Sequence, residues 1–256
     1  MIALLDRIWR TIGTAASFAL FGIGGLVLAI TYFPALNFII RDIARRERIA
    51  QQTIHGAFRF FVWFMCSVGA IRVRCEGANL LHAERGSLVI SNHVTLIDVI
   101  LIMACMDRTQ VVVKAGVWRN PFMAGVVKAA NYIPNLGDPE RLLEDCSAAL
   151  KSGNNLVIFP EGSRTLPGQK RRYQRGYAHV AVRTEAPIRL VTVACDPPFL
   201  LKGEPWWKVP TKQPCWVVRV HDRIELDDAY RYEQPSIAVR HLNAAVAKKL
   251  EDALAT

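Results

Sequence analysis

A long uncharged stretch dominates the N-terminal part of the chain. From Thr11 to Ile40 there is no charged side chain, and most positions are apolar. About 20 apolar residues are enough for a helix to span a bilayer core, so the stretch is long enough. Pro34 is expected to bend or end this helix, because proline lacks a backbone N–H. A cleaved signal peptide is disfavoured, since the run is too long and lacks a suitable cleavage site.

Arginines flank this stretch on both sides. They are Arg7 and Arg10 before it, and Arg41, Arg45, Arg46 and Arg48 after it. Basic residues favour the cytoplasmic side of a membrane, so we expect the inner (cytoplasmic) membrane with the active site on its cytoplasmic face. Because the N-terminal flank is basic as well, a re-entrant hairpin or an in-plane anchor stays open beside a single span.

A second apolar patch, Phe60–Ile71, lies between Arg59 and Arg72. It is too short to cross a bilayer. Its aromatic side chains suit a helix lying at the membrane interface. A helix docked on the protein core has the same pattern, so both interpretations remain open.

Beyond this patch, apolar runs typical of strands alternate with runs typical of helices. The predicted strands are Ile71–Cys75, Ser87–Ser91, Gln110–Lys114, Asn155–Phe159, Pro187–Ala194 and Cys215–Leu226, the last with a turn near Asp222. The predicted helices are Asp98–Met106, Pro121–Ala130, a helix from Pro139 to about Lys151, and Ser236–Leu254. Continuous apolar strands separated by helices predict an α/β fold, a buried sheet flanked by helices. We therefore expect an N-terminal membrane-anchoring helical segment at 1–72 and one α/β domain at 73–256.

Composition limits the function classes. The chain has 256 residues, 52% of them hydrophobic and 21% charged, which excludes an intrinsically disordered protein. The net charge of +10 indicates an anionic partner. Since the mean hydropathy is +0.18 and no nucleic-acid-binding motif is present, lipid or phosphate is favoured over nucleic acid.

The cysteine and histidine spacings do not match a metal site. The cysteines are Cys66, Cys75, Cys105, Cys146, Cys195 and Cys215, and no two form a CxxC pair. They are expected to be small core residues in a reducing compartment. The histidines other than His93 lack the spacing of metal ligands, so no metal is predicted.

Two short motifs carry the chemistry. The first is Asn92-His93-Val94-Thr95-Leu96-Ile97-Asp98, directly after the SLVIS strand. Asp98 is placed to reach back to the His93 imidazole, fixing its tautomer and leaving the other ring nitrogen free to accept a proton. With no serine beside it, such a pair suits a base acting on a substrate hydroxyl. Taken alone, a pair at this spacing is also common in capping and surface positions.

The second motif, Phe159-Pro160-Glu161-Gly162-Ser163-Arg164-Thr165, follows the NLVIF strand. Several cations lie in or shortly after it: Arg164, Lys170, Arg171, Arg172 and Arg175. Arginine is suited to bidentate contact with phosphate. The run from Lys170 to Arg175 could equally be a solvated basic loop.

Together, NHVTLID and FPEGSRT closely resemble the glycerophospholipid acyltransferase family, whose best-known bacterial members are 1-acyl-glycerol-3-phosphate acyltransferases. The likeness covers roughly residues 75–200. It implies that His93 is the general base and Asp98 its partner. It also implies substrate-binding or site-shaping roles for six residues: Asn92, Lys114, Glu161, Gly162, Ser163 and Arg164. Lys114 matches a family lysine thought to steady the site or the oxyanion.

The resemblance implies a membrane-bound enzyme that transfers a fatty acyl chain from a thioester donor to the hydroxyl of a lysophospholipid. The donor would be acyl-CoA or acyl-carrier protein, with membrane lipid as the other partner, and no cofactor or nucleic acid is expected. His93 would take the hydroxyl proton, the alkoxide would attack the thioester carbon, and the thiol would leave. Backbone N–H groups or Lys114 would stabilise the oxyanion.

One departure from the family pattern changes this picture. The family's second block usually ends in an arginine that contacts the acceptor phosphate, whereas this chain has Asn131-Tyr132-Ile133-Pro134-Asn135. Arg141 or the Arg171–Arg175 cluster could compensate. Alternatively, the acceptor is a specialised lipid, which the unusual Asp196-Pro197-Pro198 string and the Trp206-Trp207 region also suggest. A non-catalytic membrane lipid-binding protein of the same fold is a further alternative.

Overall fold

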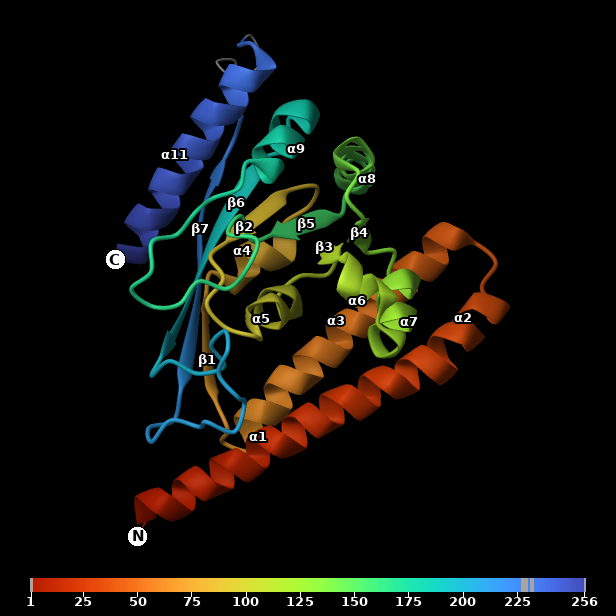
Figure 1. Cartoon of the computed structure of the whole chain (residues 1–256). Coiled ribbons are helices and arrows are strands. Elements are labelled where there is room, and N and C mark those ends of the chain that lie inside the picture. The colour runs from red at the N-terminus through yellow and green to blue at the C-terminus, as the bar shows by residue number, and fades with distance from the viewer. Residues whose placement is uncertain (1, 227–229, 231–232, 256) are drawn as a thin grey trace.

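The computed structural model describes residues 2–226, 230 and 233–255. Its N-terminal part is a pair of long helices lying side by side (Figure 1). The first consists of α1 (Ile2–Val27), a π-helical turn η1 (Leu28–Tyr32) and α2 (Phe33–Ile39), and the second is α3 (Ile43–Ser67). Pro34 neither ends nor breaks the first helix. The wider π-helical turn directly before it accommodates the missing backbone N–H.

Aromatic side chains join the two long helices. The Phe21 ring lies 4.9 Å from that of Phe61 and stacks on Phe58 at 6.2 Å. Most of the second apolar patch belongs to α3, which ends at Ser67 and packs on the protein with one face only. Phe61 is buried against the protein, whereas Phe60 and Trp63 are exposed.

The remaining chain is built around a seven-stranded sheet. Its strands are β1 (Arg72–Glu76), β2 (Leu88–Ser91), β3 (Thr109–Lys114), β4 (Ile133–Asn135), β5 (Asn155–Ile158), β6 (Ile188–Asp196) and β7 (Cys215–Ile224). They are ordered β1-β7-β6-β2-β5-β3-β4. All neighbours are parallel except β6 and β7, which are antiparallel. The carboxyl ends of β2, β5, β3 and β4 therefore meet at one edge, where sites in such sheets commonly form.

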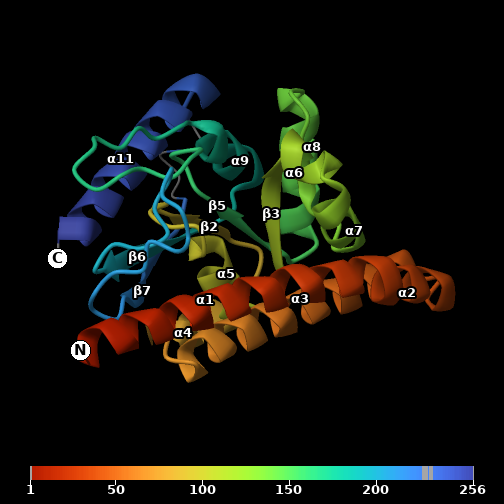
Figure 2. The ribbon, with the colours of Figure 1, turned by 60° about the horizontal axis from the view of Figure 1, so that its bottom comes forward.

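Helices cover both faces of the sheet, as the sequence predicts. They are α4 (Ala78–Ala83), α5 (Asp98–Ala104), α6 (Ala115–Arg119), α7 (Pro121–Ala129), α8 (Pro139–Lys151), α9 (Gly176–Thr184) and α11 (Pro235–Ala255). One core lies between the sheet, α5 and α3, and the other between the sheet, α8, α9 and α11. In Figure 2 the two long N-terminal helices run along the base, on the side opposite α8, α9 and α11.

The predicted elements from β1 to α11 are present, with ends that differ by one or two residues. The turn expected near Asp222 is wrong. β7 continues through this position, and a register shift lies between the pairs Arg189–Arg223 and Val191–Val220. The extra β7 residue forms a bulge rather than a turn, so the polar character of His221 and Asp222 reflects a distorted strand. The short elements α4, α6 and β4, and the helix α9, were not predicted.

The connection between β6 and β7, residues 197–214, is called the β6–β7 segment below. Arg10 of α1, only 1% exposed, donates to the carbonyls of Pro210 at 2.8 Å and Thr211 at 2.5 Å in this segment. Arg7 donates to the carbonyl of Val209 at 2.9 Å. The N-terminal half of α1 is therefore fixed to the body of the protein.

A buried ion cluster lies at the end of the sheet where β2 and β6 begin. Glu84, whose side chain is 1% exposed, pairs with Arg189 of β6 at 2.6 Å and with Arg223 of β7 at 3.1 Å. It also accepts a hydrogen bond from Ser87 at 2.5 Å. These contacts link the start of β2 to β6 and β7.

Candidate active site

His93 and Asp98 meet at the carboxyl end of β2. The hydrogen bond predicted from their spacing is present, with His93 Nδ1 3.0 Å from Asp98 Oδ2. Asp98 is the first residue of α5 and is fully buried, whereas the His93 side chain is 20% exposed. Because the carboxylate engages Nδ1, the imidazole is held with Nε2 as its free nitrogen.

Other groups hold the Asp98 carboxylate in place. The backbone N–H groups of Val94 and Thr95 both donate to Oδ2 at 2.7 Å. The Thr95 hydroxyl donates to Oδ1 and accepts a hydrogen bond from Trp216 Nε1 at 3.0 Å. This set of donors fixes the carboxylate, and through it the imidazole, against the fully buried Trp216 of β7.

The second motif lies directly against the first. Glu161 Oε1 accepts a hydrogen bond from the His93 backbone N–H at 2.8 Å, and Oε2 accepts one from the Thr165 hydroxyl. The Thr165 N–H donates in turn to the His93 carbonyl at 2.9 Å. Gly162 forms the tight turn between them with φ +66°, a conformation that favours glycine. The loop Pro160–Thr165 is called the acidic–basic loop below.

Two neighbours shape the surroundings of the imidazole. The Phe159 ring stacks on His93 with centroids 4.3 Å apart and planes inclined by 27°. Asn92 is fully buried, and its side-chain amide donates to the Val193 carbonyl and accepts from the Val193 N–H, both at 2.8 Å. Asn92 thereby joins the end of β2 to β6.

Cations lie beside the acidic–basic loop. Arg164 Nη1 donates to the Leu200 carbonyl at 3.2 Å, and among the described residues its other side-chain N–H groups have no partner. Ser163 Oγ accepts a hydrogen bond from Lys202 Nζ at 2.7 Å. Both Leu200 and Lys202 belong to the β6–β7 segment. Lys202 was not singled out in the sequence, since it lies outside both motifs and its neighbour Ser163 is 39 positions away.

Lys114 lies apart from this group. It ends β3 and is exposed, and β5 lies between β3 and the β2 strand that carries His93. Within the part of the chain that the structure describes, no hydrogen bond or ion pair joins Lys114 to the group. It is paired in register with Asn135 at the end of β4.

The basic run after the loop is partly engaged. Glu251 of α11 pairs with Arg171 at 3.1 Å and accepts a hydrogen bond from the Tyr173 hydroxyl at 2.6 Å. Burial, followed by this contact with Glu251, raises the pKa of Tyr173 above its usual range. The Gln174 N–H donates to the Pro160 carbonyl at 2.7 Å, so both ends of the run are held.

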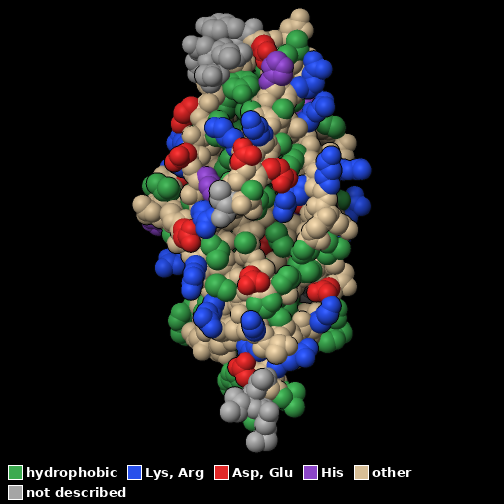
Figure 3. All heavy atoms as spheres, turned by 90° about the vertical axis from the view of Figure 1, so that its left-hand side faces the viewer, with side chains coloured by type: hydrophobic (Ala, Val, Ile, Leu, Met, Phe, Trp, Pro, Cys, Tyr) green, Lys and Arg blue, Asp and Glu red, His purple; other side chains and the backbone are tan. Residues whose placement is uncertain are grey.

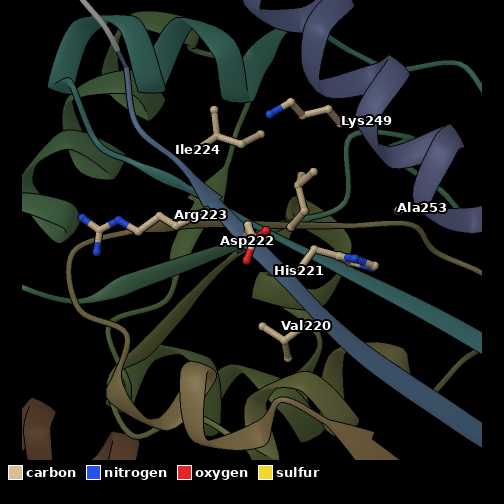
Figure 4. A pocket seen from close by; sticks show the side chains of 8 residues that line it. Val220, His221, Asp222, Arg223, Ile224, Lys249 and Ala253 are labelled. Carbon is tan, nitrogen blue, oxygen red and sulfur yellow. The ribbon is translucent and has the colours of Figure 1, made fainter.

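A separate hollow of about 380 Å³ lies between β7 and α11 (Figure 4). Its lining includes His221, Asp222, Arg223 and Lys249, and none of the residues around His93. His221 Nε2 lies 2.8 Å from the Thr192 hydroxyl, and the Arg223 side chain points away from Lys249. Among the described residues, no group of three or more His, Cys, Asp or Glu side chains could hold a metal ion.

Comparison with known proteins identifies the class. The family model described as "Acyltransferase" matches residues 72–196, a range that contains both motifs and the strands that position them. Residues 72–196 therefore form an acyltransferase domain, and the relatives and the solved structure described next support the glycerophospholipid acyltransferase family that the two motifs indicated.

Individual relatives refine this assignment. The chain is 28% identical over 149 residues to the 1-acyl-sn-glycerol-3-phosphate acyltransferase of Cocos nucifera, covering 55% of this chain and 46% of that protein. It is 23% identical over 237 residues to 1-acyl-sn-glycerol-3-phosphate acyltransferase alpha of Mus musculus, covering 88% of this chain and 78% of the relative. The chain thus matches less than half the length of the coconut protein.

Among solved structures, the chain resembles the 1-acyl-sn-glycerophosphate acyltransferase PlsC from Thermotoga maritima. The TM-score is 0.71 at 18% identity, and the match covers 98% of each chain. This similarity establishes the fold, including the apolar N-terminal helices.

Proposed function

We propose that this chain is a membrane-bound acyltransferase that moves a fatty acyl chain from a thioester to the free hydroxyl of 1-acyl-glycerol-3-phosphate. The observation that carries the proposal is the His93–Asp98 hydrogen bond of 3.0 Å with the acidic–basic loop bonded to the same histidine. A protein that only bound lipid would need no such base. The names of the relatives agree with this acceptor.

In the proposed reaction, His93 Nε2 takes the proton from the acceptor hydroxyl. The Asp98 carboxylate stabilises the resulting imidazolium through Nδ1. The alkoxide attacks the thioester carbon, and a tetrahedral oxyanion forms. When this intermediate collapses, the C–S bond breaks and the thiolate takes the proton from His93. The donor is acyl-CoA or acyl-carrier protein, and no metal or covalent enzyme intermediate is required for this chemistry.

The contacts indicate different roles for Glu161 and Arg164 in the acidic–basic loop. Both carboxylate oxygens of Glu161 accept hydrogen bonds from the protein, so we assign Glu161 to holding the loop against His93. Arg164 has N–H groups without a partner in the described part of the chain, and it carries the charge that an acceptor phosphate needs. Lys114 is the candidate for stabilising the oxyanion, since the backbone N–H groups of residues 93–95 are already bonded within the protein.

The N-terminal helices supply the proposed membrane attachment. Leu4–Ile39 is long and apolar enough to cross a membrane, and only 11% of its most apolar part is buried. Leu5, Trp9, Ile23 and Phe38 are among its exposed side chains. Because Arg7 and Arg10 fix α1 sideways to the protein body, we favour an anchor lying in the membrane plane over a perpendicular span.

Basic side chains near this anchor fit the same orientation. Lys and Arg side chains form a band across the lower part of the face in Figure 3, near the N-terminal end. A hollow of about 670 Å³ in the region of α1 and the β1–β7 edge is lined by Arg72, Arg74 and Lys212, together with Asp6 and Asp196. Cations beside an apolar helix favour anionic lipid headgroups. We propose the inner membrane, with residues 1–72 as the anchor and the catalytic part on the cytoplasmic face.

The test is release of free thiol by purified protein in detergent. Acyl-CoA and acyl-carrier protein are the donors, and lysophosphatidic acid, other lysophospholipids and glycerol-3-phosphate are the acceptors. Release that depends on lysophosphatidic acid and is lost in His93→Ala, but kept in the matched control His179→Ala, supports the proposal. The exposed His179 of α9 suits this control because its side chain lies outside the group around His93.

A second candidate function has one observation in its favour. The stretch Asn131–Asn135, which contains β4, has no arginine, whereas the family's second block usually ends in one. This difference favours an acyltransferase for a specialised acceptor. Thiol release with a lipid that lacks the phosphomonoester, and none with lysophosphatidic acid, would select this alternative. No release with any acceptor, from a folded protein that binds lipid, would select a non-catalytic binder.

A further inference from the structure

The β6–β7 segment brings a cation to the acidic–basic loop that neither motif contains. Lys202 Nζ donates to Ser163 Oγ at 2.7 Å, next to Arg164 in sequence. Arg164 is itself held by the Leu200 carbonyl at 3.2 Å, two residues before Lys202. A cation of the β6–β7 segment therefore lies at the loop that carries Arg164.

The backbone of the segment is specifically placed here. Leu200 is 3% exposed and has φ +57°, which is uncommon for a non-glycine residue and costs free energy. In this conformation its carbonyl accepts two hydrogen bonds, from Arg164 and from the backbone N–H of Leu96 at 3.0 Å. Leu96 lies in the turn between His93 and Asp98. Lys202 thus lies two residues after the Leu200 carbonyl, which is hydrogen-bonded to both catalytic motifs.

Lys202 and Arg164 have the capacity to bind an anion together. A lysine ammonium has three N–H donors, and Ser163 uses one of them. Within the described part of the chain, neither Lys202 nor Arg164 forms an ion pair with a carboxylate. By contrast, Arg171, one of the cations that could replace the missing second-block arginine, is paired with Glu251.

We propose that Lys202 binds the phosphate of the acceptor together with Arg164, and that it makes the site prefer a phosphomonoester over an uncharged acceptor. This inference rests on the proposed function, because it names a binding residue for that acceptor. A phosphomonoester carries close to two negative charges at neutral pH, more than Arg164 alone would neutralise. Lys202 thus supplies, from the β6–β7 segment, the second charge that is absent from the end of β4.

The experiment compares Lys202→Ala and Lys202→Arg with Lys208→Ala as the matched control. Lys208 is an exposed lysine of the same segment, paired with Glu204. Initial rates are measured with lysophosphatidic acid and with monoacylglycerol. In Lys202→Ala we expect the KM for lysophosphatidic acid to rise about tenfold, as for loss of one charge-assisted hydrogen bond, with kcat within about twofold. In the same variant, kcat/KM for monoacylglycerol stays unchanged. Lys202→Arg restores most of the affinity for lysophosphatidic acid that Lys202→Ala loses. Lys208→Ala has the same kinetic constants as the parent enzyme.

A binding measurement separates this inference from the proposed function. Lysophosphatidic acid is titrated into His93→Ala protein with and without Lys202→Ala. Weaker binding in the double variant supports the phosphate site. If the parent enzyme does not turn over lysophosphatidic acid, that result rejects the proposed function but not this phosphate site. Equal binding, or an active Lys202→Ala enzyme with an unchanged KM, overturns the inference and leaves the proposed function standing.

Discussion

The hydroxyl of Thr95 offers a direct test of how the catalytic pair is held. It donates to Asp98 Oδ1 and accepts from Trp216 Nε1, and all three residues are fully buried. Thr95→Val keeps the shape of the side chain and removes both hydrogen bonds. The carboxylate then loses one donor, and the indole N–H is left without an acceptor.

The magnitude follows from these two losses. A hydrogen bond to a charged group contributes about 1.5–3 kcal/mol, and an unsatisfied buried donor costs about 1–3 kcal/mol. Burying the extra methyl group returns about 0.8 kcal/mol. We therefore expect a loss of about 2–5 kcal/mol in the free energy of unfolding, or about 10 °C in Tm for a chain of this size. A less well held Asp98 also lowers kcat about tenfold, equivalent to about 1.4 kcal/mol in the barrier, with little change in KM.

The assay is thermal unfolding in detergent together with steady-state rates. Thr109→Val is the matched control, because Thr109 is buried but its hydroxyl has no hydrogen-bond partner in the described part of the chain. That variant should be neutral or slightly stabilising. The double variant Thr95→Val/Trp216→Phe should cost about 1–2 kcal/mol less than the sum of the single variants, since no donor is orphaned. Equal stability of the Thr95 and Thr109 variants, or strict additivity, would refute this reasoning.

Three further predictions concern stability. Arg10→Met should lower the free energy of unfolding by about 2–4 kcal/mol, because two carbonyls of the β6–β7 segment lose their donor. Thermal unfolding measures this loss. An unchanged Tm would show that α1 is not fixed to that segment. Glu84→Gln should cost about 3–5 kcal/mol in urea unfolding by leaving two arginines poorly compensated, whereas Glu76→Gln, at an exposed pair, should cost less than about 1 kcal/mol. Burial raises the pKa of the Cys195 thiol from 9.0 to about 12, so the unfolded chain loses this proton at lower pH than the folded protein does. The free energy of unfolding should therefore fall as pH rises from about 9 to 12. In Cys195→Ser, Tm should decline less steeply over this pH range.

Local patterns were sufficient to predict most of the sheet and the His93–Asp98 hydrogen bond. Each predicted strand is a short apolar run, and the five-residue spacing of the pair is a local property. α9 was missed because its buried face consists of Tyr177 and small residues such as Ala178 and Ala181, directly after a basic run. Such a face has little hydrophobic contrast, so the pattern does not indicate a helix.

The contacts that complete the site are non-local, and sequence patterns do not reveal them. Trp216 and Thr95 are 121 positions apart, and Lys202 and Ser163 are 39 apart. Asn92 and Glu161 illustrate a related difficulty. The motifs place them at the site, but only the fold shows that their polar atoms bind the protein's own backbone and side chains.

Because α1 is attached to the β6–β7 segment, deleting the N-terminal helix would remove a structural support as well as a membrane contact. One segment accepts hydrogen bonds from Arg7 and Arg10 and also supplies the Leu200 carbonyl to both catalytic motifs. Removing the helix to obtain a more soluble protein would therefore leave the wall of the active site without its outer support. The first helix is an integral part of the folding unit, and lost activity in such a truncation would report a disordered site as well as lost membrane contact.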